Sequence, residues 1–153
     1  CGTLGKQYTL SAQGKPKDVK TAIGYLEKAC AGKDGFCCWA AGKIYQDGKG
    51  GVAKDAAKGL AFLKIGCDLD NGTACRSYGL TLLKGEDKLG AAKALEKGCK
   101  FDDKLACVGI GGLTYYGRHV KEDKAKGTVY WKKSCKLGST AACKKLKEIG
   151  ATK

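Results

Sequence analysis

The stretch Cys30-Ala-Gly-Lys-Asp-Gly-Phe-Cys-Cys38 holds two cysteines at a spacing of C-x7-C. The same spacing recurs three times along the 153-residue chain, at Cys67 and Cys75, Cys99 and Cys107, and Cys135 and Cys143. The first cysteines of successive pairs lie 37, 32 and 36 residues apart, and the second cysteines keep those intervals. A period of this length is typical of proteins built from one supersecondary unit per repeat.

The residues before each pair predict a helix. The residue twelve positions before the first cysteine is always aspartate, the residue eight before is small, and the residue four before is large and apolar. These positions hold Asp18, Asp55, Asp87 and Asp123; Ala22, Gly59, Ala91 and Gly127; and Leu26, Leu63, Leu95 and Trp131. Spacings of four residues define one helical face, and aspartate caps a first turn. We therefore expect helices at about 18–31, 55–69, 87–101 and 123–136.

A second helix is predicted to begin around the second cysteine. A small residue precedes that cysteine, namely Cys37, Ala74, Ala106 or Ala142. Gly42, Gly79 and Gly111 stand four positions after it and indicate close packing against a neighbouring helix. Gly48, Gly85 and Gly117 stand ten after it, as expected for left-handed helix stops. The predicted helices lie at about 35–47, 72–84, 103–116 and 139–149, so the fold is all-α with hairpins of some 36 residues.

The connections between hairpins carry a family resemblance. Gly48-Lys-Gly-Gly-Val52-Ala-Lys-Asp55 recurs as Gly117-Arg-His-Val120-Lys-Glu-Asp123 and shrinks to Gly85-Glu86-Asp87. With the helix that follows, this pattern resembles the Sel1-like repeat, and the added C-x7-C resembles its Helicobacter cysteine-rich protein branch. The chain departs from the pattern in the shortened connection, at His119, and at Thr114, which stands where Tyr45 marks the usual tyrosine.

The resemblance implies an α/α solenoid, a right-handed superhelix of about four TPR-like hairpins over residues 18–150. Residues 1–17 would form an N-terminal tether that could include a degenerate cap helix, and residues 151–153 a tail. It also implies a disulfide within each C-x7-C pair, joining the end of one helix to the start of the next. A helical hairpin brings such cysteines within reach.

The alternative, zinc, normally requires C-x2-C spacing or histidines, and the chain has one histidine. Ten cysteines also fit an oxidising compartment. We predict neither a metal nor a cofactor.

Cys1 and Cys37 stand outside the repeating pairs. Cys37 fills a slot that is alanine in the other repeats, which predicts a buried small thiol. A chain that begins Cys-Gly resembles a processed bacterial lipoprotein, so Cys1 is the expected lipidation site. Alternatively, the sequence merely starts there, or Cys1 pairs with Cys37.

The charge is strongly positive, with 29 Lys and Arg against 15 Asp and Glu, and only Arg76 and Arg118 are arginines. Lysines supply solvated point charges rather than the rigid forks that read bases or clamp phosphate. We therefore predict attraction to an acidic partner or an anionic surface, or simply solubility, and no nucleic acid.

No catalytic residue is predicted. His119 lies in a connection where the related repeat has glycine, which favours a solvated loop residue over a catalytic base. The serine-enzyme signatures S-x-x-K, S-D-N and K-T-G are absent, and the nearest match, Thr81-Leu-Leu-Lys84, has the wrong nucleophile.

Aromatic residues near the third repeat's end suggest a binding site. Tyr130 and Trp131 match Phe62 and Leu63, so they are expected in the core between repeats. Tyr115 and Tyr116 have no such precedent, because they match Gln46 and Asp47. Together with Arg118 they form our predicted exposed binding patch.

Solenoids offer a concave face that suits peptides or proteins and rarely carry catalytic machinery. The predicted function is a non-catalytic scaffold lipoprotein of the bacterial periplasm or outer membrane that binds a peptide or protein on that face. One alternative is an immunity protein that neutralises a secreted toxin such as a lipase effector. A second, from family resemblance alone, is a penicillin-binding or weakly β-lactamase-like protein.

Overall fold

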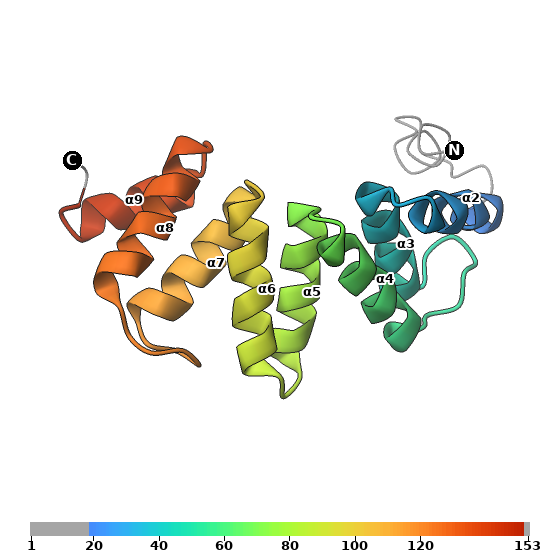
Figure 1. The fold of residues 1–153 in the computed structure, drawn as a ribbon, viewed down its shortest axis with the longest axis horizontal. Coiled ribbons are helices and arrows are strands. Elements are labelled where there is room, and N and C mark those ends of the chain that lie inside the picture. The colour runs from blue at the N-terminus through green and yellow to red at the C-terminus, as the bar shows by residue number, and fades with distance from the viewer. Residues whose placement is uncertain (1–18, 152–153) are drawn as a thin grey trace. The chain divides into compact units, whose positions relative to one another are not determined.

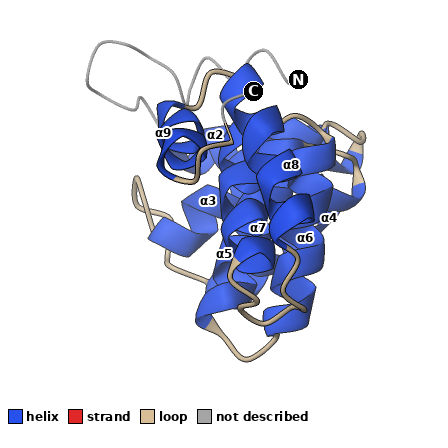
Figure 2. Cartoon of the chain, turned by 90° about the vertical axis from the view of Figure 1, so that its left-hand side faces the viewer, coloured by secondary structure: helices blue, strands red, loops and turns tan. Residues whose placement is uncertain are grey.

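The computed structural model describes residues 19–151, and all regular secondary structure within that range is helical (Figure 2). Figure 1 shows the helices in chain order. They are α2 (Val19–Ala31), α3 (Gly35–Asp47), α4 (Ala56–Asp68), α5 (Gly72–Lys84), α6 (Lys88–Lys100), α7 (Lys104–Tyr115), α8 (Lys124–Lys136) and α9 (Thr140–Glu148). Every predicted helix is present, with each end within one residue of its expected place, so the all-α repeat fold is confirmed.

Aspartates cap the first turns of α4, α6 and α8, as predicted. The carboxylates of Asp55, Asp87 and Asp123 each accept a hydrogen bond from the backbone N–H three residues on, at 2.8 Å. Asp18 lies outside the described residues. These bonds satisfy amide groups that have no partner inside the helix, which fixes where each helix begins.

The second helices have caps that sequence reasoning did not identify. The residue four positions before the second cysteine of each pair accepts a hydrogen bond from the first turn of α3, α5, α7 or α9. These residues are Asp34, Asn71, Asp103 and Ser139. Their side chains are all of the capping type. Because these residues recur at the same offset from the cysteine, the sequence alone could have predicted these caps.

The chain divides into two compact units between residues 74 and 75. In the N-terminal unit, α2, α3 and α4 surround a core that includes Leu26, Cys37 and Ala41, with Phe62 packed against it. The C-terminal unit has one core around Leu95, Cys107 and Ile110 and a second around Trp131, Ala142 and Leu146.

Small residues lie where the second helix of one hairpin contacts the first helix of the next. A Cβ atom added to Gly42 of α3 would lie 2.9 Å from the carbonyl oxygen of Gly59 on α4. In the C-terminal unit, a Cβ on Gly79 would lie 3.0 Å from the Ala91 carbonyl oxygen, and one on Gly127 would lie 2.6 Å from the Cβ of Tyr115. This confirms the predicted close packing. The second helix of one hairpin packs on the first helix of the next.

The predicted glycine stops hold in the two long connections. Gly48 and Gly117 are left-handed, with φ of 65° and 63°. Gly85 directly follows the last residue of α5, as predicted, but it is not left-handed, so only the predicted conformation was wrong. The short connection places the cap Asp87 only two residues later, so the chain enters α6 directly and has no loop for a left-handed glycine to start.

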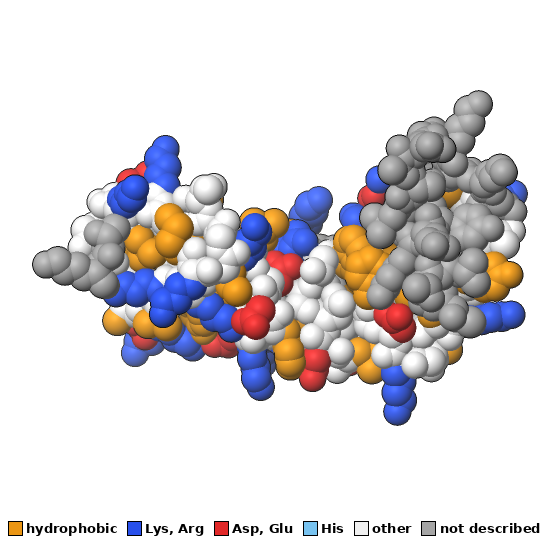
Figure 3. All heavy atoms as spheres, turned by 90° about the horizontal axis from the view of Figure 1, so that it is seen from above, with side chains coloured by type: hydrophobic (Ala, Val, Ile, Leu, Met, Phe, Trp, Pro, Cys, Tyr) orange, Lys and Arg blue, Asp and Glu red, His pale blue; other side chains and the backbone are white. Residues whose placement is uncertain are grey.

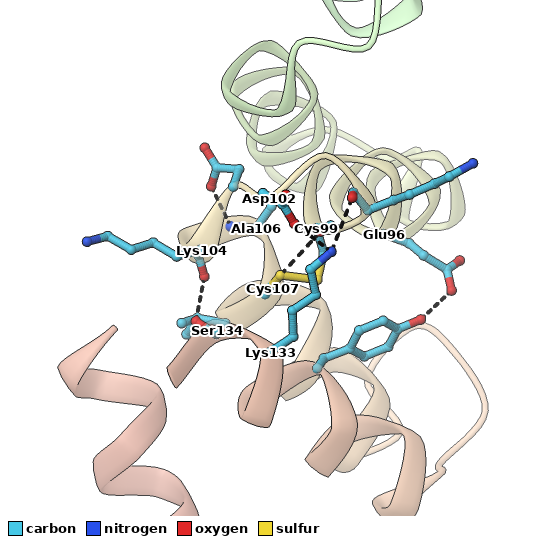
Figure 4. The surroundings of a disulfide bond; sticks show 12 residues. Glu96, Cys99, Asp102, Lys104, Ala106, Cys107, Lys133 and Ser134 are labelled. Atoms are coloured by element: carbon cyan, nitrogen blue, oxygen red, sulfur yellow. Dashed lines mark hydrogen bonds and ion pairs between the residues drawn. A yellow bond between two sulfur atoms is a disulfide. The ribbon is translucent and has the colours of Figure 1, made fainter. Parts of the chain in front are cut away.

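Each described C-x7-C turn is closed by a disulfide. The Cα atoms lie 4.7 Å apart in Cys30–Cys38, 4.5 Å in Cys99–Cys107 and 4.9 Å in Cys135–Cys143. Cys67 and Cys75 are disulfide-bonded as well. Figure 4 shows the Cys99–Cys107 bridge, with the Ser134 hydroxyl donating to the Lys104 carbonyl at 2.7 Å beside it.

The third residue after each first cysteine takes the left-handed conformation. It is Lys33, Asp70, Asp102 or Gly138, with φ between 61° and 83°. The next residue's N–H then donates back to the carbonyl five residues earlier, as from Asp34 to Ala29 at 3.0 Å. This is a Schellman-type helix end, for which glycine is the usual residue.

We expect Lys33→Gly to stabilise the protein. Lys33 is exposed, and the left-handed conformation costs a residue with a Cβ roughly 1–2 kcal/mol, partly offset by the greater chain entropy of unfolded glycine. The free energy of unfolding in urea should rise by about 0.5–1 kcal/mol. Lys33→Ala keeps the Cβ and should change little. Equal gains in both variants would contradict strain at this position.

Candidate functional site

The predicted binding patch divides between core and surface. Tyr115 packs against the C-terminal core, with its ring centroid 4.9 Å from that of Trp131. Tyr115 is therefore partly buried rather than fully exposed, because it packs against a tryptophan of α8. Tyr116 is 48% exposed, and the Arg118 guanidinium carbon lies 5.7 Å from its ring centroid. Tyr116 and Arg118 thus remain as the surface part of the patch.

The remaining aromatic predictions are met in different ways. Trp131 is 2% exposed, and its indole N–H donates to the Val108 carbonyl at 3.3 Å, so its place in the core is confirmed. Tyr130 packs partly against the neighbouring core, and its hydroxyl donates to the Glu96 carboxylate.

A charged cluster that the sequence did not reveal joins helices α2, α3 and α4 of the N-terminal unit. The Tyr45 hydroxyl of α3 donates to the Glu27 carboxylate of α2 at 2.7 Å. Lys58 of α4 donates to that hydroxyl at 2.7 Å, and its Nζ lies 2.9 Å from the Glu27 carboxylate. The Tyr45 ring stacks on that of Phe62, with the ring centroids 5.8 Å apart. The Tyr45 hydroxyl therefore hydrogen-bonds both the Glu27 carboxylate of α2 and the Lys58 ammonium group of α4.

The pKa values in this cluster follow its contacts. Burial raises the pKa of Glu27, but the hydrogen bonds from Tyr45 and Lys58 outweigh burial, so the net pKa is lowered. The hydrogen bonds to Tyr45 and Glu27 raise the pKa of Lys58. Glu27 and Lys58 are therefore both charged at neutral pH.

An equivalent cluster stands in the C-terminal unit. Lys126 of α8 lies 3.0 Å from the Glu96 carboxylate of α6, and Tyr130 donates to the same carboxylate. Hydrogen bonds from Tyr130 and Lys126 lower the pKa of Glu96. Figure 4 shows Glu96 pointing toward the tyrosine that bonds to it, away from the disulfide.

The two clusters share their charges but not their tyrosine. Glu27 and Glu96 both stand three residues before a first cysteine, and Lys58 and Lys126 both stand nine before the next. The tyrosine of the N-terminal cluster is Tyr45 of α3, whereas the tyrosine of the C-terminal cluster is Tyr130 of α8. The position of Tyr45 in the C-terminal unit is held by Thr114, which is 6% exposed.

A cavity lies where that tyrosine is replaced. It has a volume of about 420 Å³, within the roughly 300–1,000 Å³ of ligand pockets, and it lies wholly inside the C-terminal unit. Its lining includes Ala92, Glu96, Ile110, Thr114, Val120 and Lys126. Thr114 was identified in the sequence as a departure from the repeat. That the smaller threonine side chain lines a cavity is seen only in the structure.

The other predicted residues have mostly structural roles where they are described. Cys37 is fully buried in the N-terminal core, as predicted, whereas Cys1 lies outside the described residues, so its predicted lipid stays a prediction. His119 is exposed and left-handed, with φ of 64°, as is Gly50 at the equivalent position of the other connection.

The hydroxyl of the nearest match to a serine-enzyme signature has a structural contact. The Thr81 hydroxyl donates to the Ser77 carbonyl within α5, and the buried Ser139 caps α9. No group of three metal-ligating side chains occurs among residues 19–151. In that range, too, no helix has the length and apolar content to span a bilayer.

The stability supplied by the Glu27 carboxylate should be lost in acid. Because its pKa is lowered on folding, its contribution is present above the ordinary value of about 4.3 and disappears as the pH falls through the lowered one. Glu27→Gln should cost about 0.5–1 kcal/mol at pH 7 and nothing at pH 2–3. Thermal unfolding across this range tests it, with exposed Glu86→Gln as the control. A pH-independent cost would contradict the ionic origin.

Comparison with known proteins gives one family. The Sel1 repeat model matches residues 4–34, 35–71 and 104–139. The second and third matches begin at the second helix of a hairpin, which agrees with the packing of α3 on α4 and of α7 on α8. Residues 72–103 contain the shortened connection and lie outside the matches. No curated protein matches the chain significantly.

Solved structures share the fold. A Sel1 repeat protein from Oxalobacter formigenes has a TM-score of 0.82 and 23% identity over 96% of this chain. The protective antigen c5321 of uropathogenic Escherichia coli, described as displaying an SLR fold, has a TM-score of 0.80 and 21% identity over 96%. Helicobacter pylori cysteine rich protein B has a TM-score of 0.66 and 27% identity over 87%. The chain spans 61%, 32% and 97% of the respective structures.

Proposed function

The chain belongs to the Sel1 repeat family, and from this premise we propose that it is a non-catalytic binding protein of the bacterial cell envelope that holds a peptide or protein partner. Sel1 repeats typically mediate protein–protein interactions. The disulfides and the similarity to Helicobacter cysteine rich protein B suggest a place outside the cytoplasm. The periplasm or the outer membrane, with a lipid on Cys1, is our proposed location.

The observation that carries this proposal is the supported aromatic surface at the end of α7. The Tyr116 ring centroid lies 5.0 Å from that of Tyr115, edge-on, and 6.1 Å from that of Trp131, so a partly buried tyrosine and a buried tryptophan support an exposed ring. Arg118 lies beside that ring. A rigid tyrosine next to an arginine has the composition of a binding hot spot, because little side-chain entropy is lost when a partner covers it.

The surface charge supports an acidic partner. The net charge is +14, and Figure 3 shows lysine and arginine side chains (blue) that project from the surface in view. Charge of one sign steers oppositely charged partners and raises association rates, and salt screens this effect. Capture of the partner should therefore weaken as the salt concentration rises.

The test is an affinity capture from the cell envelope with the full chain as bait, at low and high salt, read by mass spectrometry. Tyr116→Ala should lose at least tenfold of the captured partner. Tyr25→Ala removes another exposed tyrosine, 37% exposed in the N-terminal unit, and should capture the partner normally.

Each outcome separates the alternatives. A stoichiometric protein lost only with Tyr116→Ala supports the proposal, and a secreted toxin as that protein would identify the immunity alternative. Retention of only anionic lipid or glycan would contradict a protein partner. Covalent labelling by a β-lactam would contradict the non-catalytic assignment.

A further inference from the structure

We propose that the cavity at Thr114 is a socket for a tyrosine side chain that the protein partner supplies. This inference rests on the proposed binding function and adds the chemistry of one contact. It derives from a comparison of the two units, because Tyr45 of the N-terminal unit stands at the repeat position that Thr114 holds in the C-terminal unit.

The apolar walls of the two places correspond. In the N-terminal unit, Tyr45 packs against the core that contains Ile23 and Ala41, together with Val52 of the long connection. Counting from the cysteines and the connection, these three positions are Ala92, Ile110 and Val120 in the C-terminal unit. All three line the cavity, and Ala92 and Ile110 are each 3% exposed. Residues at the positions of the core against which Tyr45 packs thus line the cavity in the C-terminal unit.

The polar end of the site is retained as well. Tyr45 donates to Glu27 and accepts from Lys58, each at 2.7 Å. The matching pair, Glu96 and Lys126, lies 3.0 Å apart and lines the cavity. Tyr130 of α8 already donates to Glu96 and hydrogen-bonds Lys126, but it does not line the cavity. A carboxylate accepts several hydrogen bonds and an ammonium group donates three, so an incoming hydroxyl can still donate to Glu96 and accept from Lys126.

The charges around the cavity favour a neutral ring over an anion. The lining has three lysines, at positions 93, 121 and 126, and three acidic residues, at positions 96, 122 and 123. A phosphorylated ligand would meet as many carboxylates as ammonium groups, whereas a phenol needs one acceptor and one donor. Leu89 at the edge is 57% exposed, and Lys126 has a 54% exposed side chain, so the site can be entered from solvent.

The first experiment uses N-acetyl-L-tyrosinamide as the probe and the full, oxidised chain labelled with ¹⁵N. In a two-dimensional amide NMR titration, the amides of Ala92, Thr114 and Lys126 should shift in a saturable manner. N-acetyl-L-phenylalaninamide lacks the hydroxyl and should bind at least about tenfold more weakly, because a hydrogen bond to a charged group contributes about 1.5 kcal/mol. N-acetyl-L-leucinamide should produce no saturable shift at these amides.

The matched variants place a tyrosine inside or outside the socket. Thr114→Tyr should fill the cavity from within, as Tyr45 does, and abolish the saturable shifts. Val129→Tyr adds a tyrosine at a position that is 63% exposed and should bind the probe normally. Ala92→Phe, which blocks the opposite wall, is a second test if Thr114→Tyr fails to fold, and circular dichroism checks both.

The inference is overturned if the tyrosine probe causes no saturable shift, if it binds no tighter than the phenylalanine probe, or if Thr114→Tyr binds it as the original chain does. In the envelope capture, the partner should be lost with Thr114→Tyr and kept with Val129→Tyr. A partner that Thr114→Tyr still captures contradicts the socket and leaves the proposed function standing. Capture of no protein by the original chain contradicts the proposed function itself.

Discussion

Treatment with dithiothreitol is expected to unfold this protein at room temperature and neutral pH. Each disulfide closes a loop of about nine residues, and restricting that loop in the unfolded chain stabilises the fold by roughly 2.5 kcal/mol. Eight cysteines are disulfide-bonded, so the bridges together contribute about 10 kcal/mol. Since domains are typically stable by only about 5–15 kcal/mol, helical circular dichroism should be largely lost on reduction.

A single pair gives the quantitative form of this prediction. The double variant Cys99→Ala, Cys107→Ala should lower the free energy of unfolding in urea by about 2.5–4 kcal/mol, because both side chains are buried as well as bridged. Cys37→Ala is the control: Cys37 is equally buried, but Ala74, Ala106 and Ala142 fill its slot in the other repeats, so it should cost about 1 kcal/mol or less. Equal costs would show that packing, not the bridge, supplies the stability.

Gly127→Ala should destabilise the C-terminal unit by about 2–3 kcal/mol, although alanine is the better helix former. The new Cβ would lie 2.6 Å from the Cβ of Tyr115 and 2.8 Å from its backbone nitrogen. A rotamer change cannot relieve contact with a backbone, so α8 would have to move away from α7. Thermal unfolding followed by circular dichroism should show a markedly lower Tm.

Gly112→Ala on α7 is the matched control. A Cβ at Gly112 would have no atom within 4 Å outside its own helix backbone and chain neighbours. The substitution should therefore raise stability by about 0.5–1 kcal/mol through helix propensity alone. Changes of the same sign in the two variants would contradict helix contact as the reason for glycine at position 127.

The helices could be predicted from the sequence because local chemistry defines their ends. Asp55, Asp87 and Asp123 cap a first turn, and Gly48 and Gly117 end helices in a left-handed conformation that needs no distant contact. Gly85 also follows the end of a helix, but its left-handed conformation was predicted wrongly, because a much shorter connection has no left-handed turn to make. The repeat pattern predicts that glycine follows each of these helices, but the length of the connection determines whether that glycine is left-handed.

The site was less predictable because it depends on contacts between helices. Tyr115 was expected on the surface because its equivalent, Gln46, is polar, but α8 carries Trp131 where the earlier repeat carries Leu63, and the larger ring covers it. The pairing of Glu96 with Lys126 joins residues 30 positions apart, and neither position was singled out. Thr114 was noted as a departure, but the cavity it leaves requires the placement of Ala92 and Val120.

The short span of each disulfide also determines how the protein can mature. Eight cysteines could pair in on the order of 100 ways, and slow reshuffling often limits the folding of such chains. Here each described bridge joins cysteines eight residues apart, so a segment that enters an oxidising compartment holds both partners as soon as its turn is present. Each of these bonds can therefore form locally, and the bonds formed first are already native.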